Sequence, residues 1–337
     1  MIASRIKMLA LSLTLALLGG VAAQAQDGRT EIRLAHHMPL THHLHRGAEA
    51  FAKYFNEHNT KYHITVFGAG QLYTEKALVQ SVSTGAVEMS FTTPAFWSGT
   101  APSVSVIDYP FLLNTYPRAK AAFDGKMGQA ISAEIEKAGV KVLGWLHFGI
   151  NDVIVNNVRP LVQVEDIKGL RLRSPNPMGA AMLKATGAGA VVMSATEVYL
   201  AVQRGTLDGT ITGATAVTQR KMYEVAKYAT IFPLQYSAHP LAVNRRFWNK
   251  LTPEEQKTML DAAAAGTAVT VEAAQKEGQK AIDDFRKLMQ VNDLTPAVLA
   301  ELSKVAEKSS SDYLKEIGGE DSLKVLALAR EDIKNVK

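Results

Sequence analysis

The chain has 337 residues, of which 47% are hydrophobic and 20% charged, and it contains no cysteine. This balance is typical of a globular protein, and the lack of cysteine excludes disulfides, thiolate metal sites and a cysteine nucleophile. The formal net charge is only +5 and the basic residues are scattered, so a nucleic-acid-binding function is not indicated.

The N-terminus has the pattern of an export signal. Arg5 and Lys7 precede an apolar run over residues 8–23, which ends in an Ala-x-Ala motif. This pattern predicts a signal peptide in residues 1–25, cleaved near Ala25. The run is too short to cross a bilayer as a helix, so we expect a soluble, periplasmic mature protein.

Short β-rich segments then alternate with helical ones over a length that suits two domains, which predicts an α/β fold with largely parallel strands. We expect strands over residues 31–36, 63–67, 87–92, 142–147, 152–156, 170–173, 190–193 and 241–244. Helices are expected over residues 43–58, 75–84, 118–138, 178–186, 196–204 and 219–227.

The clearest helix begins at Thr252, where a capping threonine is followed by Pro253 and two glutamates. Periodic apolar residues continue to about residue 289. We expect a single long helix that braces two domains. The alternative is two helices separated near Gly266 or Gly278, because a glycine inside a helix is unfavourable.

Three central segments follow one another in order: Asp166–Pro175 (DIKGLRLRSP), Gly187–Met193 (GAGAVVM) and Glu197–Gly209 (EVYLAVQRGTLDG). This part of the chain resembles the substrate-binding P subunit, or DctP-like protein, of TRAP transporters. Weaker similarity, at residues 67–72, 85–89, 109–111 and 223–228, extends the resemblance over nearly the whole mature chain.

The resemblance implies a two-domain periplasmic binding protein fold with a cleft between the domains. Crossing strands and a long C-terminal helix would join the domains, which close on an organic acid by a hinge motion. Residues 26–150 with about 239–278 would form domain I. Residues 151–238 with about 279–337 would form domain II.

In the resembled family an arginine in the strand after the Gly-Leu pair holds the ligand carboxylate, and Arg173 occupies that position. A guanidinium can donate two parallel hydrogen bonds to a carboxylate and stays charged when buried. Arg171 lies two residues earlier, on the same face of the strand, and is expected to be its solvated neighbour.

Other ligand-binding candidates follow from their position at strand ends. Glu75, Thr93 and Thr212 lie where ligands bind in α/β sheets. Phe96 and Trp97 are candidates to cover an apolar part of the ligand, with ordinary core packing as the alternative. Structural roles are expected for Glu197, Tyr199 and Asp208.

The sequence departs from the resembled family at Asn151 and Asp152, where many members carry a second arginine. Without that cation, a dicarboxylate or a sialic-acid-like ligand is disfavoured. An acidic Asp152 in the pocket would favour a zwitterion or a hydroxylated monocarboxylate instead.

A histidine-rich segment supplies a competing hypothesis, because neutral imidazoles bind transition metals. It contains His36, His37, His42, His43 and His45. A periplasmic metal-binding protein is therefore one alternative. The other interpretation is that one neutral histidine, His36 or His37, donates a hydrogen bond to the organic ligand, and we expect no metal site.

No enzyme is predicted, because the chain lacks G-x-S-x-G, a P-loop and a dinucleotide-binding G-x-G-x-x-G. No cofactor is expected. The expected partners are a small organic acid and the membrane subunits of a TRAP transporter, and a monomer is the default. A ligand-loaded sensor that docks on a receptor kinase is a further alternative.

Overall fold

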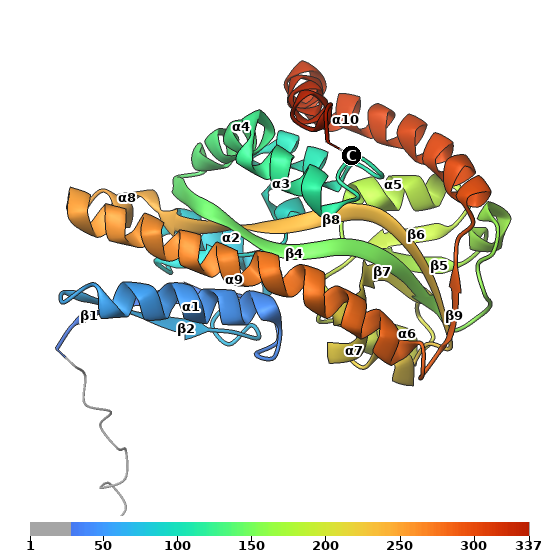
Figure 1. The fold of residues 1–337 in the computed structure, drawn as a ribbon, viewed down its shortest axis with the longest axis horizontal. Coiled ribbons are helices and arrows are strands. Elements are labelled where there is room, and N and C mark those ends of the chain that lie inside the picture. The colour runs from blue at the N-terminus through green and yellow to red at the C-terminus, as the bar shows by residue number, and fades with distance from the viewer. Residues whose placement is uncertain (1–27, 337) are drawn as a thin grey trace, which may run out of the picture.

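The computed structural model describes residues 28–336, so the signal peptide expected in residues 1–25 lies outside the described part (Figure 1). Within residues 28–336 no helix is both long enough and apolar enough to cross a membrane.

The described strands form one mixed sheet in the order β2-β1-β3-β8-β4-β7-β5-β6, with β9 paired to β8. The pairs toward both ends of the sheet are parallel, but β3–β8, β8–β4 and β4–β7 are antiparallel. The expectation of largely parallel strands is therefore wrong at the centre of the sheet. The strands are β1 (Thr30–Ala35), β2 (Tyr62–Phe67), β3 (Met89–Phe91), β4 (Val140–Asn156), β5 (Arg171–Ser174), β6 (Gly189–Val192), β7 (Gly209–Gly213), β8 (Tyr228–Asn244) and β9 (Gln290–Asp293).

Two long central strands, β4 and β8, pair over their whole length and connect the two halves of the molecule (Figure 1). The sequence predicted two short strands, 142–147 and 152–156, in place of β4. The register of β4 shifts at three points, before Gly144, Gly149 and Val153. Such bulges interrupt the alternation by which a strand is recognised in a sequence.

Most helices begin and end close to where the sequence placed them. The helix expected over residues 118–138 is instead two helices that meet at Gly125. The helix expected over 219–227 is wrong, because the chain turns at Lys221, which has a φ of 53°. The helices are α1 (His43–Glu57), α2 (Glu75–Thr84), α3 (Tyr116–Asp124), α4 (Lys126–Glu136), α5 (Pro177–Ala185), α6 (Val198–Gln203), α7 (Ala214–Gln219), α8 (Arg245–Trp248), α9 (Pro253–Phe285) and α10 (Pro296–Ile333), with 3-10 turns over Pro94–Trp97, Pro102–Asp108, Val164–Ile167 and Met222–Glu224.

The long helix α9 is continuous, as expected, and braces the two halves. Thr252 and Glu255 form a capping box at its start. Met259 packs into a core with β1, β2 and α1, whereas Phe285 packs into a separate core with α6, α7 and the start of β8. At 1.5 Å per residue, 33 helical residues extend about 50 Å, which is long enough to reach both cores.

The second long helix, α10, also contacts both halves. Leu302 packs with the core around β5, whereas Leu314 and Leu326 pack with the core around α3 and α4. The helix is kinked at Gly319, where φ is 51°. The end of α10 therefore packs with the first half, although the sequence grouped residues 279–337 with domain II.

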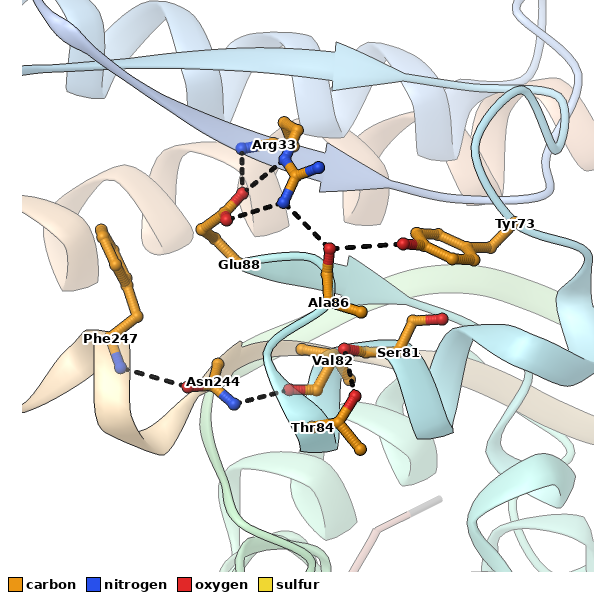
Figure 2. Close-up of polar contacts among 9 residues, drawn as sticks. All are labelled: Arg33, Tyr73, Ser81, Val82, Thr84, Ala86, Glu88, Asn244 and Phe247. Carbon is orange, nitrogen blue, oxygen red and sulfur yellow. Dashed lines mark hydrogen bonds and ion pairs between the residues drawn. The ribbon is translucent and has the colours of Figure 1, made fainter.

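Polar contacts near its C-terminal end fix the position of α2 against β1 and β8 (Figure 2). Asn244, at the end of β8, donates from Nδ2 to the carbonyl of Val82 at 2.8 Å. Arg33 forms a forked pair with Glu88, which follows α2, with N···O distances of 2.9 Å. These contacts hold the helix whose first residue is Glu75.

Candidate functional site

A cavity of about 40 Å³ lies where the carboxyl ends of β1, β3, β5, β6 and β7 meet. Strand ends of this kind are the usual ligand position in α/β proteins. Both halves of the molecule contribute to its wall. The lining residues are His37, Met38, Thr93, Phe148, Ser237 and His239 from the first half and Arg173, Pro175, Ala195, Thr212, Ala216 and Arg220 from the second.

Arg173 is a buried cation in the wall of this cavity, with 5% of its surface exposed. Its Nε donates to the carbonyl of Met193 at 3.0 Å and its Nη1 to the carbonyl of Ile211 at 3.3 Å. Burial lowers the pKa of Arg173 to about 10, so the side chain is still charged at neutral pH. Two carbonyls thus orient the guanidinium, and further N–H donors remain for another group.

Arg171 has a different environment, although it lies only two residues away. It is exposed and pairs with Asp208, with Nη2 and Oδ1 2.6 Å apart. Arg171 does not line the cavity. The structure therefore places Arg171 as a solvated neighbour, as the sequence predicted, and pairs it with Asp208, for which the sequence predicted a structural role.

Glu75 lies behind the cavity wall, and among the described acids it is the one whose charge acts on both Arg173 and Arg220. Its Oε1 accepts from Thr93 Oγ1 at 2.5 Å and lies 3.1 Å from His37 Nε2, and its Oε2 accepts from Ser194 Oγ at 2.6 Å. Burial alone would raise the pKa of Glu75, but these partners and Arg173 outweigh it and hold the pKa at about 2. The carboxylate is therefore ionised and connects Thr93 in one half with Ser194 in the other.

His37 lines the cavity and is neutral, because burial lowers its pKa more than the nearby Glu75 raises it. A neutral ring that faces a carboxylate through Nε2 carries its proton on that nitrogen and donates it. Its Nδ1 is buried and has no hydrogen-bond partner among the described residues. This nitrogen is thus an unused acceptor.

Arg220 is a second cation in the cavity wall that the sequence did not reveal. Its Nε is buried without a hydrogen-bond partner in the described part of the chain. Burial lowers its pKa, while the charge of Glu75 acts in the opposite direction. The sequence predicted no cation at Asn151 or Asp152, and Arg220 brings one to the cavity wall from a different element, the end of α7.

An aromatic stack closes the other side of the cavity. The ring of His239 is parallel to Phe148, with centroids 5.9 Å apart, and nearly parallel to His37 at 5.8 Å. Burial lowers the pKa of His239 to about 3, and its Nδ1 has no partner among the described atoms. Gly213 leaves room for the Phe148 ring, because a Cβ there would lie 2.6 Å from Cε1.

The remaining candidates divide into residues at the cavity and residues in the core. Thr93 and Thr212 both line the cavity. Trp97 is completely buried in the first-half core, and neither it nor the half-buried Phe96 is part of the lining. Trp97 therefore has the core-packing role that was the alternative to ligand contact.

Four histidines of the histidine-rich segment are engaged in local structure. His36 Nδ1 accepts from the backbone N–H of Met38, and its Nε2 faces His45 at 3.0 Å. His42 caps α1, and His43 contacts the carbonyl of residue 147 at 3.1 Å. His36 is absent from the cavity lining, unlike His37. Among the described side chains, no group of three or more His, Cys, Asp or Glu residues could hold a metal ion.

Asn151 and Asp152 lie in the middle of β4, where the backbone of Asn151 pairs with Gly213 and Gln235. The side chains of Asn151 and Asp152 lie outside the described part of the structure.

Comparison with known proteins gives a family match. The chain matches the model of the bacterial extracellular solute-binding proteins, family 7, over residues 34–316. It is 27% identical over 291 residues to the C4-dicarboxylate-binding periplasmic protein DctP of Rhodobacter capsulatus, covering 85% of this chain and 87% of that protein. It is 28% identical over 225 residues to the 2,3-diketo-L-gulonate-binding periplasmic protein YiaO of Escherichia coli, covering 66% and 68%.

A solved structure agrees with this match. The TRAP periplasmic solute-binding protein of Desulfovibrio salexigens, with bound orotic acid, superposes with a TM-score of 0.86 at 25% identity, covering 92% of this chain and all of that one. The expected two-domain binding-protein fold is thereby confirmed, as is the prediction that the chain is not an enzyme. The chain belongs to the bacterial extracellular solute-binding proteins of family 7 and is a TRAP transporter substrate-binding protein.

Proposed function

We propose that this chain captures a small organic carboxylate in the cavity between its halves, with Arg173 as the anchor, and delivers it to TRAP membrane subunits. The observation that carries this proposal is a buried guanidinium, oriented by two backbone carbonyls, in the wall of an interdomain cavity. A carboxylate is the ligand group that such a fork suits best. The ligands of two relatives support it, orotic acid in the Desulfovibrio protein and a molecule assigned as pantoate in a Bordetella protein that is 25% identical.

Capture would proceed by hinge closure. At about 40 Å³ the cavity has room for roughly three ordered waters. A larger ligand therefore requires the halves to stand further apart than they do here. The hydrogen bond from Ser194 to Glu75 joins the halves at the cavity and would form on closure.

The proposal includes the export route and the domain division. The signal peptide in residues 1–25 would direct the chain to the periplasm, where the mature protein would act as a monomer. The two domains would divide near residues 150 and 238, where β4 and β8 cross. The end of α10 would return to domain I, because Leu314 and Leu326 pack in that core.

Differential scanning fluorimetry of the mature chain against an organic-acid library tests the capture role. A ligand at 100 times its dissociation constant adds about 2.7 kcal/mol to the free energy of unfolding. We expect carboxylates to stabilise the wild type and Arg171→Ala but not Arg173→Ala. Divalent metals belong in the same screen, and stabilisation by metals alone would contradict the carboxylate proposal.

Closure and delivery need separate measurements. Small-angle scattering should show a smaller radius of gyration with a stabilising carboxylate than without it, and equal radii would contradict hinge closure. Uptake by liposomes that contain the cognate membrane subunits should require this protein. Binding to a receptor kinase without any such uptake would favour the sensor alternative.

A further inference from the structure

The cavity contains more positive charge than its internal acid can balance. Arg173 and Arg220 both line it, and neither forms an ion pair with a described side chain. Glu75 is the one described acid whose charge acts on either guanidinium. Among the side chains that the structure describes, two cations and one anion leave a net charge of +1 at this position.

Glu75 is held as an anion by its contacts. It accepts hydrogen bonds from Thr93 and Ser194, and His37 Nε2 lies 3.1 Å from Oε1. As the first residue of α2 it also lies at the positive end of a helix dipole. Hydrogen bonds to the charged form and a helix N-terminus both favour the carboxylate over the neutral acid.

The two histidines of the wall do not change this count. His37 faces Glu75 with one nitrogen, and the charges of Arg173 and Arg220 both oppose its protonation. His239 is stacked between His37 and Phe148 and fully buried. Both rings are neutral, and each retains an unpartnered, buried Nδ1.

We propose that Glu75 sets the charge of the ligand, so that the cavity accepts one carboxylate and excludes a second, and the ligand is a small hydroxylated monocarboxylate. This inference rests on the proposed carboxylate capture by Arg173 and assigns Arg220 as a specificity-determining residue. Glu75 offsets one of the two arginine charges, so one carboxylate neutralises the cavity and a second would add an uncompensated negative charge, which costs affinity. A hydroxyl is the neutral group from which the free Nδ1 of His239 or of His37 can accept a hydrogen bond.

Matched ligand pairs test the charge rule, because each pair shares a carbon skeleton and differs by one carboxylate. The pairs are 2-hydroxybutanoate and malate, erythronate and tartrate, and gluconate and glucarate. By calorimetry at pH 7.5 we expect the wild type to bind the monocarboxylate of at least one pair at least about 10-fold more tightly than its dicarboxylate. Equal or tighter binding of the dicarboxylates would overturn the inference and leave the proposed function intact. If no carboxylate binds, the proposed function itself fails.

Charge-changing variants identify the residue responsible. Glu75→Gln keeps the shape of the side chain and raises the cavity charge to +2, so the preference should move toward the dicarboxylate by about 10-fold or more. Glu75→Gln/Arg220→Gln returns the charge to +1 and should restore the preference for the monocarboxylate. A purely structural role of Glu75 predicts no such restoration.

Two further variants keep the result interpretable if Glu75→Gln folds poorly. Arg220→Gln alone lowers the cavity charge to zero and should weaken monocarboxylate binding at least 10-fold. Asp152→Asn tests the other acid that the sequence suggested, and a reversal of preference in this variant would overturn the assignment to Glu75. Glu301→Gln, on the exposed face of α10, makes the same charge change outside the cavity. It should leave the ratio of monocarboxylate to dicarboxylate affinity unchanged for every pair.

Discussion

The two walls of the cavity differ in the chemistry that each offers. The second half contributes Arg173 and Arg220, so its wall is cationic. The first half contributes His37, His239 and Phe148, whose stacked rings are neutral. A site of this kind separates anchoring of the anionic group, on one wall, from discrimination among neutral groups, on the other.

Glu75 connects these two walls. It belongs to the first half, yet it contacts Ser194 of the second half and its charge acts on Arg173 and Arg220. In the proposed hinge motion, the negative charge would therefore move with the neutral wall as the halves separate. An open form would leave both arginines more exposed to a ligand anion and to water, so the charge balance of the cavity would be complete only on closure.

Replacement of the anchor should give the largest effect. In Arg173→Lys the charge remains but the fork is lost, along with the contacts to the carbonyls of Met193 and Ile211. We expect carboxylate affinity to fall about 100-fold, equivalent to about 2.7 kcal/mol, measured by calorimetry. Arg171→Lys is the matched control, and a similar loss there would show that the cationic wall has been assigned wrongly.

The neutral wall depends on a glycine of the opposite half. In Gly213→Ala the new Cβ would lie 2.6 Å from Cε1 of Phe148, so the ring must shift away from His239. Overpacking of this kind destabilises by about 1–3 kcal/mol. Chemical denaturation should show a lower free energy of unfolding for Gly213→Ala than for the wild type. The double variant Gly213→Ala/Phe148→Leu should recover part of that loss. If the stability of Gly213→Ala equalled that of the wild type, the Phe148 ring would not be packed tightly against Gly213.

The pH dependence of stability should reveal the buried, neutral His239 of the first-half wall. Burial lowers the pKa of His239 to about 3, against an ordinary value of 6.5. Between these two pH values, His239 is protonated in the unfolded chain but not in the folded chain. Stability is therefore lost as the pH falls below 6.5. His239 changes the free energy of unfolding by at most about 1.4 kcal/mol per pH unit. The stability of His239→Phe should depend less steeply on pH between 6 and 4, as measured by denaturation midpoints, and an equal slope would contradict burial of a neutral imidazole.

Other groups titrate in the same window, so the comparison must be made between variants. His43 and His147 also have pKa values lowered to about 4 by burial and change stability in the same direction. Burial raises the pKa of Asp108 to about 8, which gives the opposite slope, because the folded chain then holds the extra proton. The difference between the wild type and His239→Phe removes these shared contributions.

The sequence predicted the elements that carry strong local signals. The helix from Thr252 has a capping threonine, a proline and an acidic first turn, and it is found as expected. The bounds of α2 were predicted correctly, because Gly85 adopts the left-handed conformation that ends a helix. The strand around Arg173 was predicted from its local pattern, whereas the place of Arg173 at a ligand site followed from the family resemblance.

The missed residues lacked any such signal. Arg220 was placed in a helix because nothing in the sequence marks Lys221 as a residue with positive φ. His239 lies in β8, whose last eleven residues are all buried, so the alternation that identifies a half-buried strand is absent. The role of such residues depends on which distant segments meet at the cavity, and the local pattern contains no information about that.

The smallest expected effect tests discrimination by the neutral wall alone. His239→Phe keeps a ring that can stack on Phe148 but removes the unpartnered Nδ1. A neutral hydrogen bond contributes about 1 kcal/mol, so affinity for a hydroxylated monocarboxylate should fall about 5-fold. Affinity for the same acid without its hydroxyl should not change, because the arginine wall is intact. If both acids lost affinity equally, His239 would act through packing and the hydroxyl would have to be recognised elsewhere, with His37 as the next imidazole to replace.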